Sequence, residues 1–110
     1  MEQISKQSFK ALSDMTSVIA DRFFMARRIY EIKNGECLAE VDIDGDAYLQ
    51  YLEKVNKAFG ALSEGEQNLI NNEFFYQGYH NWWEPIYSKA TFYRCKKQAM
   101  MKFLGAFYND

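Results

Sequence analysis

Apolar and small side chains recur at alternating steps of three and four from position 9 to position 30, and this spacing places them on one face of a helix. The stripe consists of Phe9, Leu12, Thr16, Ile19, Phe23, Ala26 and Tyr30. Asn34 and Gly35 follow the last periodic residue, and a glycine there ends a helix at little conformational cost. The pattern therefore predicts a long first helix that ends near residue 34.

A second helix is predicted after an acidic connection at residues 36–46. Its apolar positions are Tyr48, Leu52, Val55, Phe59 and Leu62, with Gly60 close to its end. Apolar and polar residues alternate over residues 37–43, which would also suit an extended strand, but a connecting loop is the preferred interpretation. We expect Asp44 or Asp46 to cap the second helix, because a carboxylate accepts hydrogen bonds from the free amides and suits the helix dipole.

A third helix is predicted from a capping box at residues 63–66, where the sequence is SEGE. In this motif Ser63 accepts from the Glu66 amide, and the Glu66 side chain reaches back to the Ser63 amide. The helix is expected to begin near Glu64. Its apolar positions are Leu69, Ile70, Phe74 and Phe75, and Gly78 ends it.

The last helix is predicted to follow a turn that contains the single proline. Residues 79–84 form a short aromatic turn or helix, and Pro85 closes it because proline lacks an amide donor. Ser88 is the expected N-cap of the last helix. Its inward positions are Phe92, Cys95, Ala99, Met100, Phe103 and Phe107. Together the patterns predict a single all-α domain over residues 1–110, about five helices in one core, with a helical hairpin (1–60) packed on a helix-turn-helix (62–110).

Charge is distributed unevenly along the chain, although the net charge is only −2. Residues 86–104 contain five bases and no acid, which gives this segment a charge of +5. Residues 31–73 contain ten acids and three bases, which gives −7. This asymmetry indicates an oriented surface, with one face for a polyanion and another for solvent or a basic partner.

Residues 62–104 follow the plan of helix, glycine, short helix, tight connection and basic helix, which is that of a helix-turn-helix. Three of its segments are similar to motifs of a known family. LSEGE at 62–66 is similar to an L-S/T-x-x-E opening, and FYQG at 75–78 is similar to the aromatic-x-x-Gly that ends the scaffold helix. YSKATFYR at 87–94 is similar to the Y-S-R-x-T-x-Y-R that starts the recognition helix. On these segments the chain resembles region four of bacterial sigma factors and the phage transcription regulators of the ArpU type.

The chain departs from this family at residues 81–86, where NWWEPI replaces a pattern such as W-x-E-I-A-x-x-L. The second helix of the motif is therefore expected to be short, and proline within it is expected to change the tilt of the recognition helix. Of the adjacent Trp82 and Trp83, one ring is expected in the core and one at its edge, in preference to a stacking platform for unpaired bases.

The resemblance implies a DNA-binding, transcription-regulator-like protein that places the helix 88–104 in the major groove of duplex DNA. Helix geometry leaves Lys89, Ala90, Tyr93, Arg94 and Lys97 facing outward. The expected DNA contacts are Lys89, Ala90, Tyr93, Arg94, Lys96, Lys97 and Lys102, with Lys96 and Lys102 on the phosphate backbone. A solvated basic face would show the same pattern. A protein-interaction module or adaptor on a sigma-like scaffold, without DNA binding, stays open as the alternative.

The remaining expectations concern partners and location. Besides duplex DNA, the partners considered are RNA polymerase or another transcription protein and a second copy of this chain. No apolar run approaches the roughly 20 residues that cross a bilayer, and the first residues do not follow the order of a signal peptide. We therefore expect no membrane contact and a cytoplasmic location.

Catalytic, cofactor and metal sites are not predicted. The sequence has no glycine-rich phosphate loop, no nucleophile elbow, no H-E-x-x-H and no supported carboxylate pair, so an enzyme is not expected. Acids at alternate positions over residues 42–53 are spaced as in a calcium loop, but Ala47 stands where that loop requires glycine. His80 lacks partners spaced for catalysis or metal binding, and Cys37 and Cys95 are both expected to be free thiols.

Overall fold

The computed structural model describes residues 4, 6–34 and 45–108, and every regular element in this part of the chain is helical. The helices are α2 (Phe9–Asn34), α3 (Gly45–Gly60), α4 (Glu64–Ile70) and α5 (Lys89–Tyr108). A π-helical turn, η1, continues α4 over Asn71–Phe75. The predicted all-α class is confirmed, with four packed helices where the sequence indicated about five.

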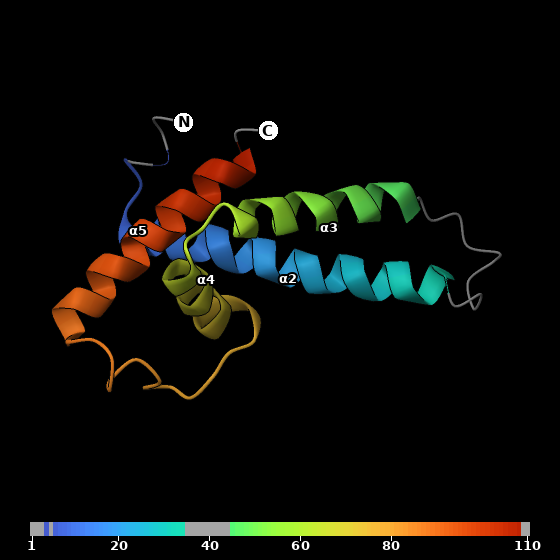
Figure 1. Ribbon diagram of the computed structural model, residues 1–110. Coiled ribbons are helices and arrows are strands. Elements are labelled where there is room, and N and C mark those ends of the chain that lie inside the picture. Colours follow the sequence, from blue (N-terminus) through green and yellow to red (C-terminus); the bar gives the residue numbers. More distant parts are fainter. Residues whose placement is uncertain (1–3, 5, 35–44, 109–110) are drawn as a thin grey trace.

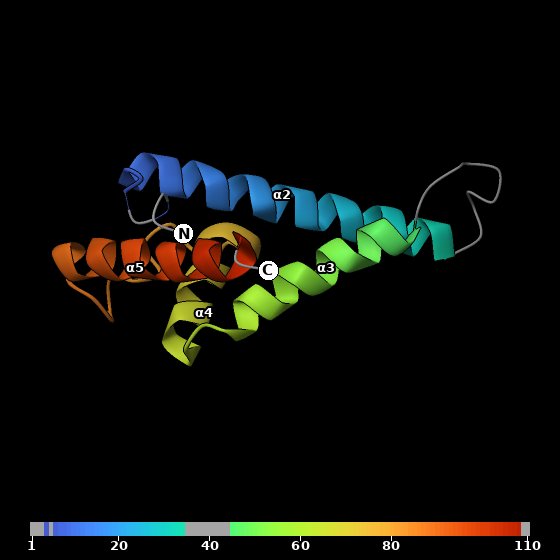
Figure 2. The same cartoon turned by 90° about the horizontal axis from the view of Figure 1, so that it is seen from above.

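The first two helices form an antiparallel hairpin in which α2 and α3 lie side by side (Figure 1). Figure 2 shows that the two helices are closest where α2 ends and α3 begins, and that they diverge towards the other end of the hairpin. α4 and α5 lie at this open end. α5 packs against α2, α3 and α4. The predicted arrangement of an N-terminal hairpin packed on C-terminal helices is therefore the observed one.

One cluster of buried apolar side chains joins all of these elements. The stripe predicted for the first helix is buried at Leu12, Thr16, Ile19 and Ala26, and that of the last helix at Phe92, Ala99, Met100, Phe103 and Phe107. Burial of a leucine or phenylalanine side chain contributes about 1.5–3 kcal/mol relative to leaving it exposed. The buried Thr16 hydroxyl is satisfied within its own helix, since it donates to the Leu12 carbonyl at 2.8 Å.

The connection between α2 and α3, residues 35–44, lies outside the described residues. The predictions for Gly35, for Cys37, for the alternation at 37–43 and for a cap at Asp44 all fall there. α3 begins at Gly45, so Asp46 lies in its first turn. The last part of the calcium-like spacing is helical, because α3 runs through residues 45–53.

The third helix differs from the prediction in its second half. The capping box forms, with Ser63 N donating to Glu66 Oε1 at 2.9 Å and Glu66 N to Ser63 Oγ at 3.3 Å. After Ile70, however, the helix widens to a π turn, in which the Tyr76 amide donates a hydrogen bond to the Asn71 carbonyl at 2.8 Å. π turns inside helices occur frequently at functional sites.

Residues 80–86, which we call the turn segment, form consecutive turns where the resemblance implied a short second helix. The Trp82 amide donates to the Tyr79 carbonyl and the Ile86 amide to the Trp83 carbonyl, at 3.1 and 2.9 Å. Of the predicted turn or short helix, the structure shows the turn, because Pro85 provides no amide to extend the pattern. None of the described helices is long and apolar enough to span a membrane.

Candidate nucleic-acid interface

The exposed side of α5 carries the outward positions that the sequence indicated. Lys89, Ala90, Tyr93, Arg94 and Lys97 are all exposed. Lys89, Tyr93 and Lys97 follow one another at steps of four, and Ala90 and Arg94 form the neighbouring row. We call these five residues the basic face. Within the part of the chain that the structure describes, its three cations form no ion pair.

The basic face is held in place by the opposite side of the same helix. Met100, Phe103 and Leu104 are fully buried against the other helices. In both ribbon views the amino-terminal part of α5 extends beyond the start of α2 (Figures 1 and 2). The basic face therefore lies on the exposed side of the amino-terminal half of a firmly packed helix.

The start of α5 is fixed by a cap and a ring stack. Ser88 Oγ accepts from the Thr91 amide at 3.3 Å, which is the predicted N-cap contact. Trp83, from the turn segment, stacks on Phe92 with ring centroids 4.5 Å apart and planes at 9°. These contacts set the direction in which α5 leaves the turn.

The first turn of α5 concentrates positive potential. It contains Lys89 and no acid, although carboxylates are the side chains that stabilise a helix amino terminus. The partial positive charge of the free amides and the lysine charge therefore add at the same end. This arrangement disfavours the isolated helix slightly and attracts anions.

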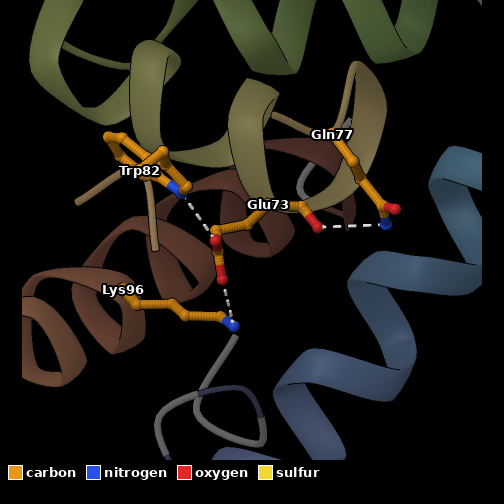
Figure 3. Close-up of polar contacts among 4 residues, drawn as sticks. All are labelled: Glu73, Gln77, Trp82 and Lys96. Atoms are coloured by element: carbon orange, nitrogen blue, oxygen red, sulfur yellow. Dashed lines mark hydrogen bonds and ion pairs between the residues drawn. The ribbon is translucent and has the colours of Figure 1, made fainter. Parts of the chain in front are cut away.

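Lys96, which the sequence indicated as a phosphate contact, lies outside the basic face and is largely enclosed. Its side chain is only 14% exposed, and Nζ lies 2.7 Å from Oε1 of Glu73, itself 16% exposed. The other oxygen of Glu73 accepts from Trp82 Nε1 at 2.7 Å, so one carboxylate joins η1, the turn segment and α5 (Figure 3). The Lys96 ammonium also lies over three rings, those of Phe9, Phe74 and Phe92, at 5.3–5.9 Å. Lys96 is therefore a structural cation.

Lys102 is exposed but paired. Its Nζ lies 3.0 Å from Oε2 of Glu66, the residue that also completes the capping box of α4. Partial burial alone would raise the pKa of Glu66, but the hydrogen bond from the Ser63 amide and the contacts with Lys102 outweigh it and lower the pKa below its ordinary value. Lys102 thus links α5 to α4, about one and a half turns beyond Lys97, the last residue of the basic face.

The remaining candidate side chains lie apart from this helix face. Trp82 and Trp83 are both half-buried and pack on the core, so neither ring is a free platform. His80 is exposed on the turn segment, and Cys95 is a partly buried free thiol. Among the described side chains, no three of His, Cys, Asp or Glu lie together as a metal site requires.

Sequence reasoning missed Glu73, although a signal for it existed. Glu73 follows the buried Leu69 by four residues and the buried Ile70 by three, so it occupies an apolar stripe. Lys96 likewise lies four residues after Phe92 and four before Met100. Opposite charges on two inward stripes indicate an ion pair between the helices that carry them.

The three segments on which the sequence resemblance rests lie at the ends of elements. Residues 62–66 contain the cap and first turn of α4, residues 75–78 begin with the last residue of η1, and residues 87–94 contain the cap and first turns of α5. Turns occupy residues 80–86 between the second and third segments. No family model, no curated protein and no solved structure matches this chain.

Proposed function

We propose that this protein binds duplex DNA through the basic face of α5, as a transcription-regulator-like protein. The observation that carries the proposal is the set of three exposed cations, Lys89, Arg94 and Lys97, without an acid partner among the described residues. They lie on the exposed side of the amino-terminal half of α5, whose first turns extend beyond the start of α2, and a helix fits the major groove. Lys96 and Lys102 are not included, because Glu73 and Glu66 neutralise them.

The roles within the basic face follow from side-chain chemistry. Arg94 suits a guanine edge or a phosphate, and Lys89 and Lys97 suit phosphates. Tyr93 and the methyl group of Ala90 lie between the cations, where they suit a phosphate and a thymine methyl group. The affinity is expected to come mainly from the charges.

The number of cations gives a quantitative expectation for salt dependence. Neutralising three phosphates gives a slope of about −2.7 in log K against log salt concentration. Between 50 and 200 mM salt the affinity should then fall about forty-fold. A homodimer that binds two half-sites would double the slope to about −5.4. The slope therefore reports on both the contact and the number of copies bound.

The test is a fluorescence-anisotropy titration of a labelled random-sequence duplex at these two salt concentrations. The double variant Arg94→Glu/Lys97→Glu should lose binding and keep its melting temperature. The matched control Arg22→Glu/Arg28→Glu changes the net charge equally at exposed positions of α2 and should still bind. Retained binding by the α5 variant, or equal loss in both variants, would refute the assignment of this face.

A second candidate is a protein-interaction module that does not bind DNA. It is favoured by apolar side chains on the outer surface of α2, where Val18 and Met25 are 46% and 62% exposed. They lie seven residues apart and therefore on one helix face. If no duplex binds at the lower salt concentration while RNA polymerase subunits are retained by the immobilised chain, and Met25→Lys abolishes that retention, this second function is supported.

A further inference from the structure

A recess of about 360 Å³ lies beside the basic face. It is bounded by the end of η1, by the turn segment and by the first turns of α5. Its lining includes Asn72, Gly78, Tyr79, Asn81, Trp83 and Tyr93. Tyr93 belongs to both the recess and the basic face, so a ligand in the recess would be adjacent to the exposed cations.

The floor of the recess is rigid and aromatic. Phe92 is stacked on Trp83 and is met by Tyr93 at a centroid distance of 5.3 Å. Tyr93 is also held edge-on by Phe9 at 5.7 Å, yet it remains 43% exposed. A flat ring entering the recess would therefore meet the exposed part of Tyr93, which Phe9 and the buried Phe92 hold in place.

Tyr79 forms a free aromatic wall. It is 88% exposed, and its ring contacts no other ring of the described residues. A tyrosine in this position contributes almost no burial to the fold. Its ring is thus available to cover a ligand, and its removal should leave stability unchanged.

The polar groups of the recess suit the edge of a base. The side chains of His80 and Asn81 have no hydrogen-bond partner among the described residues. Gln77 donates through Nε2 to the Glu73 carbonyl at 3.4 Å, which leaves its own carbonyl oxygen available (Figure 3). Because the charge of Lys96 is balanced by Glu73, the recess favours a neutral, planar ligand with donors and acceptors over a phosphate or a metal ion.

We infer that this recess binds one unpaired nucleobase of a DNA strand whose phosphates lie along the basic face. Lys89 and Lys97 lie four residues before and after Tyr93, which is about 6 Å along the helix axis on either side. A base packed between Tyr79 and Tyr93 would thus have a cation on each side of it for the adjoining phosphates. The inference rests on the proposed function, which supplies the strand.

The experiment uses the full chain and two labelled duplexes of the same sequence. In one, 2-aminopurine is paired with thymine, and in the other it is an unpaired extra base. Stacking on an aromatic side chain should quench the fluorescence of the unpaired probe only. Tyr79→Ala should weaken binding of the unpaired probe about ten-fold and leave the paired duplex unaffected. Tyr79→Phe should retain the wild-type behaviour, as should the control Tyr108→Ala at an exposed tyrosine of the last turn of α5.

The outcomes separate the recess from the basic face. If both duplexes bind equally and Tyr79→Ala changes neither, the recess does not take a base, while the proposed function stands. If neither duplex binds but free 2-aminopurine riboside is quenched in a manner that depends on Tyr79, the recess takes a base from a free nucleoside and the proposed function fails. If neither the duplexes nor the free nucleoside bind, both are wrong.

Discussion

Lys96 and Lys97 are adjacent and carry the same charge, yet the structure predicts opposite consequences when either is changed to methionine. Lys96 is enclosed, at 14% exposure, and pairs with Glu73 at 2.7 Å. Lys97 is exposed and unpaired among the described residues. Methionine retains the apolar stem of lysine and removes the charge, so each variant isolates the contribution of one ammonium group.

The expected cost of Lys96→Met follows from what it leaves behind. Glu73 would remain a largely enclosed carboxylate with the Trp82 indole as its only described donor. Removing one partner of a buried ion pair costs about 3–5 kcal/mol, and the lower end applies here because some solvent still reaches both groups. At about 4 °C per kcal/mol for a domain of this size, the melting temperature should fall by about 10 °C. Lys97→Met should change the free energy of unfolding by less than about 0.5 kcal/mol.

DNA binding should show the reverse order. Lys97→Met removes one phosphate contact, so the slope of log K against log salt concentration should become less steep, changing from about −2.7 to about −1.8. Lys96→Met should leave the slope unchanged at temperatures where the variant is folded. Thermal unfolding by circular dichroism and anisotropy titrations at two salt concentrations measure the two properties independently.

A third variant tests the cause of the destabilisation. In Lys96→Met/Glu73→Gln no charge is left enclosed, and the amide oxygen can still accept from Trp82. This double variant should therefore be more stable than Lys96→Met alone. A wild-type melting temperature for Lys96→Met, or a salt slope that depends on Lys96 rather than Lys97, would show that the ion pair is not structural.

Two further predictions concern the third helix and the segment after it. The folded-state pKa of Glu66 is lowered, so its contribution to stability is present above its ordinary pKa and is lost as the pH falls through the lowered value. Urea unfolding at pH 5 and below about pH 4 should therefore show a smaller loss of unfolding free energy for Glu66→Gln than for the wild type. Equal losses in the two proteins would contradict this prediction. A Cβ at Gly78 would lie 2.7 Å from Oδ1 of Asn72, whose amide group donates to the Asn68 carbonyl at 2.8 Å, so Gly78→Ala should cost about 1 kcal/mol. In an Asn72→Ala background the same change should be neutral or stabilising by about 0.4–1 kcal/mol, and an equal effect in both backgrounds would rule out the clash.

The sequence predicted those features that depend on near neighbours in the chain. Ser63 and Glu66 form the capping box because their three-residue spacing alone determines the geometry. The buried stripe through Phe92, Met100 and Phe103 follows from helix periodicity in the same way. Both predictions are confirmed because residue spacing within one helix determines these features, whatever the helix packs against.

Features that depend on distant partners were not predictable in the same way. The role of Lys96 is decided by Glu73, which lies 23 residues earlier in the chain. The position of Glu73 depends in turn on η1, where one extra residue enters the helical turn and changes the direction of the following side chains. A helical projection of α5 alone separates Lys96 from the outward position of Lys97, but it does not identify Glu73 as the partner of Lys96.

Turns at residues 80–86, where the sequence resemblance implied a short second helix, decide what orients α5. In a helix-turn-helix, packing between two helices sets the tilt of the recognition helix. In this protein the direction of α5 is set by the stack of Trp83 on Phe92 and by the bridge from Glu73 to Trp82 and Lys96. Four of these residues, Glu73, Trp83, Phe92 and Lys96, also line the recess. The aromatic packing that orients α5 therefore also places an open recess, in which the charges of Glu73 and Lys96 balance, next to three exposed cations.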